Sequence, residues 1–195
     1  MPDAAPPVLT VVLAAGLATR FGGGKLDAKI GETRVGSWSI NALEKAGLAP
    51  GIIVVGPRQP QFCSEHPRWR CIVNPEPEAG IGSSIKVALR FAEQQKSEAL
   101  MIALADMPMV TPEHFRSVAG AQGLAATRYH DGRLGVPARI PKAVFSELAD
   151  SCGQRGANDF LATHASVQAI TTDMASLVDI DTPQDLTLCG QLGRE

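Results

Sequence analysis

The sequence predicts a three-layer α/β/α fold, in which a mostly parallel central sheet lies between two layers of helices. Short, nearly continuous apolar runs rich in Val, Ile and Leu recur along the chain, as expected for strands buried on both faces. Segments with helical spacing separate these runs, and such an alternation favours a parallel sheet. The chain has 195 residues, 45% of them apolar, which fits a single domain over 1–195. Residues 1–7 are expected to form a loose terminus.

Each expected element has its own local signal. The apolar runs predict strands at 8–14, 51–56, 70–73, 99–105 and 123–127. Apolar residues three and four positions apart predict helices near 36–47 and 83–95. Two later helices have sharper starts, because Thr111 and Thr182 each place a capping hydroxyl before a proline at the first helical position. Asp185 is expected to complete a capping box with Thr182.

Charge and composition exclude several classes of protein. The formal net charge is −2 and charged residues make up 19% of the chain, so the basic surface of a nucleic-acid-binding protein is absent. No run approaches the roughly 18 apolar residues of a membrane span, and the first residues do not resemble a signal peptide. We therefore expect a cytoplasmic protein without a nucleic-acid or membrane partner. The four cysteines are scattered, which favours bystander roles over a metal site. The oligomeric state is not predicted.

A glycine-rich stretch with two cations follows the first predicted strand. Residues 11–25 read VVLAAGLATRFGGGK, so Arg20, three glycines and Lys25 follow the apolar run. Ligands of open parallel sheets bind beyond the carboxyl ends of the strands, and glycines let backbone N–H groups approach phosphate oxygens. Neither G-x-x-x-x-G-K-[ST] nor a G-x-G-x-x-G that opens a helix fits this stretch. The residues predict a polyphosphate-binding loop, and the alternative is a flexible turn with two solvated cations.

Four blocks, in order along nearly the whole chain, resemble the molybdenum cofactor nucleotidyltransferases. The first block matches the family pattern L-A-A-G-x-S-x-R-x-G-x-x-K, except that Ala18 replaces the serine. NPEPEAGIGSSI at 74–85 resembles the G-x-G-S-S-L segment, and MIALADMPMV at 101–110 resembles the strand that ends in G-D-x-P. DIDTPQDL at 179–186 resembles the closing D-I-D-T-P-E-D-L. The resemblance implies a Rossmann-like nucleotidyltransferase fold of the MobA-like type, with a cytidylyltransferase as the expected member.

The resemblance also implies a reaction and the residues that carry it out. A nucleotidyl group would pass from a nucleoside triphosphate to a phosphorylated small molecule, with Mg²⁺ as cofactor and pyrophosphate as the leaving group. The expected catalytic residues are Lys25, Arg20 and Asp106, with Arg20 on the β- and γ-phosphates and Lys25 at the α-phosphate. The expected metal ligands are Asp106 and Asp181, with Asp179 as the alternative to Asp181. The expected nucleotide-binding residues are Leu13, Ala14, Ala15, Gly16, Arg20, Gly22, Lys25, Gly82, Ser83 and Ser84.

The same comparison predicts the base and leaves the acceptor open. In this family L-A-A-G together with G-x-G-S-S-L accompanies CTP, whereas L-A-G-G with a G-P-L-type segment accompanies GTP. Cytidylyl members carry G-H-P and G-D-x-G-A-R at the pterin end, where this chain has Val136, Gln154 and Asn158 in place of the histidine, aspartate and arginine. Arg155 either replaces the missing cation or is a solvated side chain. Molybdopterin is therefore the first candidate acceptor, and these three replacements leave room for another.

Several alternatives stay open at this point. Guanylyl transfer, or a sugar-phosphate or polyol-phosphate acceptor, would keep the reaction class. A non-catalytic nucleotide-binding chaperone or sensor is suggested by Ala18, Val136 and Gln154, and a redox enzyme is disfavoured because the dinucleotide glycine pattern is absent. Single residues also have structural interpretations. In these interpretations Asp106 is a surface residue at a turn before Pro108. Ser83 is then a helix N-cap, and Asp179 or Asp181 supports the Thr182 cap.

Overall fold

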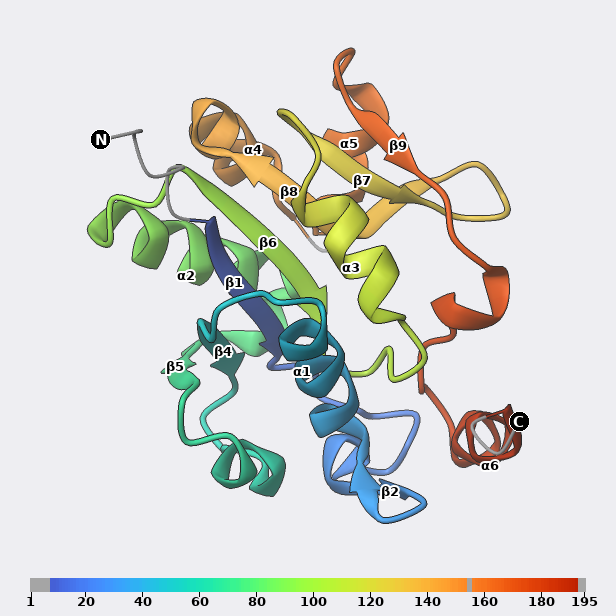
Figure 1. Cartoon of the computed structure of the whole chain (residues 1–195). Helices are drawn as coiled ribbons and strands as arrows, with labels where there is room; N and C mark the ends of the chain where they lie inside the picture. Colours follow the sequence, from blue (N-terminus) through green and yellow to red (C-terminus); the bar gives the residue numbers. More distant parts are fainter. Residues whose placement is uncertain (1–7, 154–155, 193–195) are drawn as a thin grey trace.

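A seven-stranded sheet forms the centre of the computed structural model, which describes residues 8–153 and 156–192 (Figure 1). The strand order is β5-β4-β1-β6-β8-β7-β9, and every neighbouring pair is parallel except the two that β8 makes. This confirms the mostly parallel sheet. The strands are β1 (Val8–Ala14), β4 (Ile52–Val55), β5 (Arg70–Val73), β6 (Ala99–Leu104), β7 (Ala125–Arg128), β8 (Leu134–Pro141) and β9 (Gln168–Ile170). The predicted loose terminus, 1–7, lies outside the described residues.

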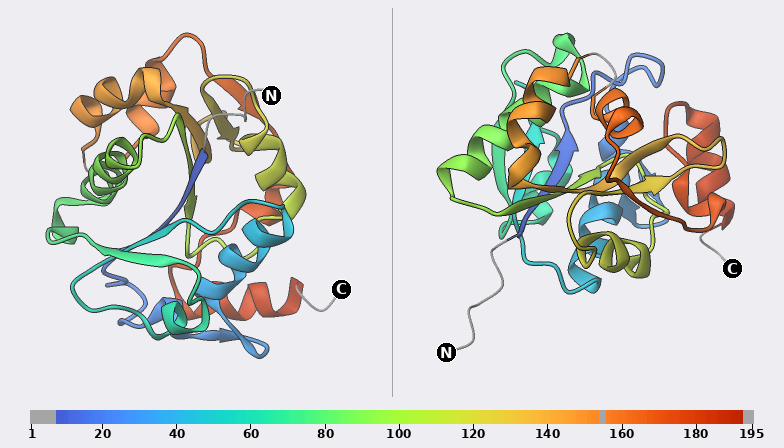
Figure 2. Two further views of the ribbon diagram at one scale, coloured as in Figure 1. Left: turned by 60° about the vertical axis from the view of Figure 1, so that its left-hand side comes forward. Right: turned by 90° about the horizontal axis from the view of Figure 1, so that it is seen from above.

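Helices cover both faces of the sheet, which confirms the three layers. The helices are α1 (Val35–Lys45), α2 (Ile81–Gln94), α3 (Pro112–Ala119), α4 (Phe145–Ser151), α5 (Asn158–Thr163) and α6 (Pro183–Leu192). Figure 2 shows α2 and α4 on one side of the sheet, and α1 and α3 on the other. Successive side chains of β1 alternate between the layers, since Val12 packs with the α1 and α3 side, and Val11 with the α2 side. Both faces of β1 are therefore buried, as its continuous apolar run predicts.

Both predicted helix starts are present. The Thr111 hydroxyl accepts a hydrogen bond from the backbone N–H of His114, 3.2 Å away, at the start of α3. At α6 the Asp185 carboxylate accepts from the Thr182 N–H at 2.7 Å, and the Thr182 hydroxyl accepts from the Asp185 N–H at 3.3 Å. These two bonds are the reciprocal pair of a capping box. Hydrogen bonding to Thr182 lowers the pKa of the Asp185 carboxyl, although its partial burial opposes this.

The strand β8 is the main departure from the sequence expectation. It lies inside the sheet, antiparallel to β6 and β7, although it contains Gly135, Pro137 and Pro141. A proline cannot donate to the ladder, so it is unusual in an interior strand. Two carbonyl groups of β8 accept hydrogen bonds from side chains, since the Tyr129 hydroxyl donates to Val136 O at 2.6 Å and the Thr127 hydroxyl donates to Pro137 O at 2.8 Å. The register between β7 and β8 also shifts at 126–127.

The topology places two loops at one edge of the sheet. The chain builds β1, β4 and β5 outward in one direction and then returns through α2 to place β6 on the other side of β1. The order therefore reverses between β1 and β6. In open α/β sheets, ligands bind beyond the carboxyl ends of the strands at such a switch point. The loops that follow β1 and β6 carry Lys25 and Asp106.

Candidate active site

The loop after β1 turns back on itself and buries its last residue. Gly22, Gly23 and Gly24 all have positive φ, at 85°, 96° and 66°, which glycine adopts without the steric penalty of a side chain. Ala18, at the position of the family serine, also has a positive φ of 49°. Lys25 then opens the short 3₁₀ helix η1 (Lys25–Asp27) and is only 6% exposed. The three glycines therefore return the lysine to the protein interior.

Three segments distant in sequence meet at this lysine. The Lys25 Nζ lies 2.6 Å from Asp106 Oδ2 and 3.4 Å from Asp181 Oδ1. The Arg20 Nη1 lies 2.8 Å from the other carboxylate oxygen of Asp181. Backbone bonds fix the segments, because the Ala105 N–H donates to Leu13 O and the Ile180 N–H donates to Asp106 O. The predicted catalytic and metal-binding side chains are thus in contact, while their roles stay predictions.

The charges of this cluster affect one another. Burial alone would lower the pKa of the Lys25 ammonium, but the negative charge of Asp106 and the hydrogen bond to it, together with Asp181, raise it. Asp179 lies nearby, and its desolvation by the surrounding protein, followed by the charges of Asp106 and Asp181, raises the pKa of its carboxyl to about 7. The carboxyl groups of Asp106, Asp179 and Asp181 thus repel one another at one place, an arrangement that a bound cation would stabilise.

The structure separates Asp181 from the helix cap. The Asp185 carboxylate accepts the backbone N–H groups of both Asp181 and Thr182, at 3.0 and 2.7 Å. The Asp181 carboxylate is directed instead at Arg20 and Lys25. Asp185 therefore supports the Thr182 cap, and the choice of Asp181 over Asp179 as the second metal ligand stays a prediction.

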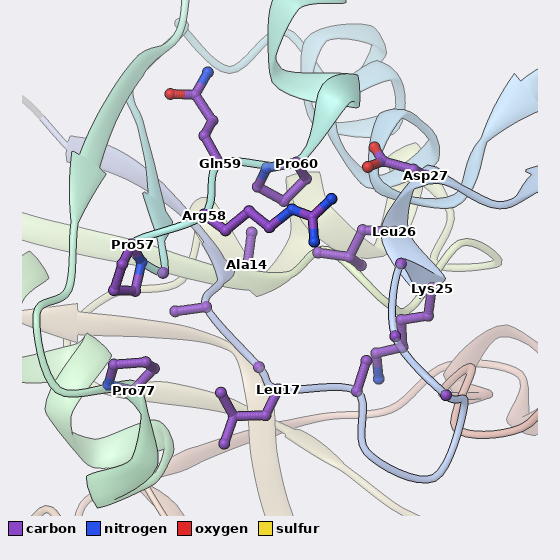
Figure 3. A pocket seen from close by; sticks show the side chains of 17 residues that line it. Ala14, Leu17, Lys25, Leu26, Asp27, Pro57, Arg58, Gln59, Pro60 and Pro77 are labelled. Carbon is purple, nitrogen blue, oxygen red and sulfur yellow. The ribbon is translucent and has the colours of Figure 1, made fainter.

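A first cavity, of about 460 Å³, lies under the glycine loop (Figure 3). Five of the predicted nucleotide-binding residues line it: Ala14, Ala15, Gly16, Gly22 and Lys25. Leu13 lies behind this surface with 6% exposure and does not line it. The loop Gly56–Pro60, which follows the neighbouring strand β4, forms the opposite wall with Pro77.

A second cavity, of about 610 Å³, lies on the other side of the cluster. Its polar lining includes Arg20 and Asp181, so Arg20 belongs to this cavity and not to the first. Val136 and Asn158, the replaced acceptor-side positions, both line it. Gln154 and Arg155 lie outside the described residues. Lys25 lines the first cavity and contacts Asp181 of the second, so the Lys25 cluster stands where the two cavities meet.

The predicted base-binding segment has internal partners. The amide of Asn74 donates to the hydroxyls of Ser83 and Ser84, at 2.8 and 3.0 Å, and the Ser83 hydroxyl lies 2.7 Å from Gly80 O. Gly82 packs against backbone, since a Cβ added there would lie 2.3 Å from Gly153 O. None of these residues lines either cavity. Contact with the base stays a prediction for them, and the structure gives each a role within the fold.

Replacing Gly82 by Ala is expected to lower the free energy of unfolding by about 1–3 kcal/mol, because the methyl group must displace the backbone at Gly153. The intrinsic helical preference for Ala over Gly, about 1 kcal/mol, opposes this and is smaller. Chemical denaturation measures the change. Gly190→Ala in α6, where the added Cβ meets nothing within 4 Å, is the matched control and should be neutral or stabilising. Equal stability of the Gly82 variant and the wild type would contradict the packing argument.

Several cavity residues were not predicted from the sequence, among them three with large polar side chains. Arg58 lines the first cavity, and Tyr129 and Arg133 line the second. Arg58 follows the strand next to β1, so the rule that ligands lie beyond carboxyl strand ends points to it once the strand order is known. Tyr129 and Arg133 flank the turn between β7 and β8, and β8 itself was not predicted.

None of the four cysteines forms a disulfide, and Cys63, Cys152 and Cys189 are buried. Within 8–153 and 156–192, no helix has the length and apolar character needed to cross a membrane.

Comparison with known proteins identifies one matching family and several relatives. The protein-family model of the MobA-like NTP transferase domain matches residues 10–168. The purine catabolism protein PucB of Bacillus subtilis is 27% identical over 196 residues, covering 92% of this chain and 94% of the relative. The crystal structure of Rv0371c from Mycobacterium tuberculosis is 26% identical with a TM-score of 0.80, over 96% of this chain and 99% of that one. Rv0371c has also been solved as a complex with manganese, at 25% identity and a TM-score of 0.73, over 94% of this chain and 98% of that one.

A nucleotidyl transferase from Methanothermobacter shares the fold. Its TM-score is 0.81 at 19% identity, over 96% of this chain and 99% of that one. The family model covers most of the chain, and the fold and the lysine–carboxylate cluster agree with it. The chain therefore belongs to the MobA-like NTP transferase domain family and is a nucleotidyltransferase.

Proposed function

We propose that the protein transfers a cytidylyl group from CTP to the phosphate of molybdopterin, or of a related phosphorylated small molecule, with Mg²⁺ as cofactor. The observation that carries this proposal is the position of the Lys25–Asp106–Asp181 cluster between two cavities. A group-transfer enzyme needs two substrates on either side of the reacting atom. The glycine-lined cavity suits the triphosphate, and the second cavity suits the acceptor.

In this reaction an acceptor phosphate oxygen attacks the α-phosphorus, and the bond to the bridging oxygen breaks. The electron pair of that bond leaves with pyrophosphate. The Lys25 ammonium, placed at the boundary of the two cavities, would stabilise the negative charge that grows on the α-phosphate and the leaving oxygen. Arg20 would orient groups that enter from the second cavity, where it lies. The chain thus supplies position and positive charge, which account for most of the catalysis in such transfers.

The donor set fits a divalent cation. Within the described ranges no three His, Cys, Asp or Glu side chains are already arranged as a metal cluster. Mg²⁺ is usually held by one or two carboxylates together with substrate phosphates, so Asp106 and Asp181 form a suitable pair. Asp179, whose carboxyl pKa is raised first by desolvation and then by the charges of Asp106 and Asp181, adds a third carboxyl group at the same place. A bound Mg²⁺ would polarise the α-phosphate, and the manganese complex of Rv0371c shows that a relative binds a divalent ion.

The choice of CTP rests on the sequence form L-A-A-G with G-x-G-S-S-I, and molybdopterin on the family resemblance. The second cavity supports an acceptor with an apolar body, because Ile81, Ile85, Leu134 and Val136 line it. Guanylyl transfer and sugar-phosphate or polyol-phosphate acceptors are the alternatives. The relative PucB is named as a purine catabolism protein, and this name does not identify an acceptor.

Pyrophosphate release tests the proposal. The purified protein is incubated with each of the four nucleoside triphosphates, Mg²⁺ and molybdopterin, and the pyrophosphate formed is measured. We expect release with CTP that depends on both Mg²⁺ and the acceptor, and formation of the cytidylylated product by mass spectrometry. Faster release with GTP would replace CTP by the guanylyl alternative. No release with molybdopterin, but release with a sugar phosphate or polyol phosphate, would overturn the acceptor assignment.

A further inference from the structure

The two cations predicted for the triphosphate are already engaged by carboxylates. Lys25 contacts Asp106 and Asp181, and Arg20 contacts Asp181 and lines the second cavity. A triphosphate that entered the first cavity would bring several negative charges against these pairs. An arginine on the wall of the first cavity with no carboxylate partner would add to the attraction of this anion.

Arg58 is such an arginine. It is exposed, it lines the first cavity, and no hydrogen bond or ion pair joins it to another residue in the described part of the chain. Figure 3 shows its side chain extending from the loop after β4 across the cavity toward Leu26, on the segment that begins with Lys25. The lining of the first cavity contains one other cation, Lys25.

The loop that carries Arg58 is tied to the segment of Lys25. The Asp27 carboxylate of η1 accepts the backbone N–H groups of Gln61 and Phe62, at 3.0 and 2.9 Å, where η2 (Gln61–Glu65) begins. Pro57 and Pro60 flank Arg58 and Gln59; each proline fixes its own φ, and Pro60 also restricts the backbone of Gln59. The two walls of the cavity are thus linked, and Asp27 is occupied by these bonds. These bonds place the loop that carries Arg58 opposite the glycine loop.

We propose that Arg58 binds the β- and γ-phosphates of the nucleoside triphosphate, opposite the backbone N–H groups of Gly22–Gly24. This inference rests on the proposed function, because it takes the first cavity as the triphosphate site. A planar guanidinium with its donors in a fixed fork matches two phosphate oxygens, which a lysine ammonium does not reproduce. Arg58 then takes the role that the sequence pattern assigns to Arg20, and Arg20 is left for the acceptor side.

Calorimetric binding without acceptor tests the proposal, with Mg²⁺ at fixed concentration. The ligands are CTP, GTP, CMP, GMP, cytidine and inorganic tripolyphosphate, and the proteins are the wild type, Arg58→Ala, Arg58→Lys and Arg68→Ala. Arg68 is the matched control, since it is exposed and paired with Glu44 at 2.9 Å away from the cavity lining. We expect Arg58→Ala to raise the Kd of the preferred triphosphate and of tripolyphosphate about 10- to 100-fold, as for a lost charged hydrogen bond. Arg58→Lys should recover only part of this affinity.

The monophosphates and cytidine distinguish a phosphate contact from a base contact. Unchanged Kd values for the preferred monophosphate in Arg58→Ala support the proposal. An equal loss for the triphosphate and the monophosphate, or no loss for either, would overturn it. A failure of the proposed function would give a different result. The wild type itself would prefer a base other than cytosine, or would not bind any triphosphate. Far-ultraviolet circular dichroism confirms that each variant is folded.

Discussion

Asp106→Asn is expected to lower kcat for nucleotidyl transfer by about 10³-fold, which corresponds to about 4 kcal/mol of transition-state stabilisation. The Asp106 carboxylate lies 2.6 Å from the Lys25 ammonium at the end of β6. Asn has almost the same size and removes the charge, so the variant loses the ligand proposed for Mg²⁺ and the main partner of Lys25. The initial rate of pyrophosphate release at saturating CTP, Mg²⁺ and acceptor measures this effect.

The control for this variant is Asp150→Asn, an exposed carboxylate at the end of α4. It should retain full activity. Thermal unfolding of both variants shows whether the fold persists, and the Asp106 backbone bond to Ile180 N–H does not depend on the side chain. A folded Asp106→Asn protein with more than about a tenth of wild-type kcat would exclude this carboxylate from the transfer step.

Lys25→Met is expected to lower kcat by about 10²- to 10³-fold, as the loss of one preorganised charge at the transition state does. Met fills a similar volume and carries no charge, so Asp106, Asp179 and Asp181 would face the α-phosphate without a buried cation between them. The main effect should fall on kcat and not on KM for CTP, because the charge on the leaving oxygen grows only in the transition state. Steady-state kinetics over a range of CTP concentrations separates the two parameters.

Lys29→Met is the matched control, since Lys29 is exposed and its nearest anion, Glu32, is 3.8 Å away. Its kinetics should equal those of the wild type. Lys25→Arg keeps the charge, but the larger guanidinium does not fit the same space between two carboxylates, so partial activity is expected. A large rise in KM with unchanged kcat for Lys25→Met would make Lys25 a binding residue and not a catalytic one.

The predictable part of the fold is the part with a local signal. The strands β1 at 8–14 and β5 at 70–73 are found at their predicted bounds, because each is a short, mostly apolar run rich in β-branched residues. The caps at Thr111 and Thr182 were predictable because one hydroxyl and one proline determine each start. The strand β8 was not predictable, because its prolines lack the N–H group of a strand ladder and argue against an interior strand.

The candidate site was also predictable only in part. Arg20, Lys25, Asp106 and Asp181 could be named from sequence blocks, and they are in contact in the structure. Their division between the two cavities could not be predicted, because it depends on how the glycines turn the loop after β1. Arg58 carries no motif, and only the strand order and the cavity bring it to the site. The sequence could therefore supply the chemistry of the centre, but not the arrangement of the substrates around it.

A crystal structure of the protein with a non-hydrolysable CTP analogue and Mg²⁺ tests the central claim most directly. The account predicts the triphosphate in the cavity under the glycine loop, with the α-phosphate within hydrogen-bonding distance of Lys25 and the metal ion bound to Asp106. Density for the triphosphate in the second cavity, or an α-phosphate that contacts neither Lys25 nor a metal ion on Asp106, would contradict it.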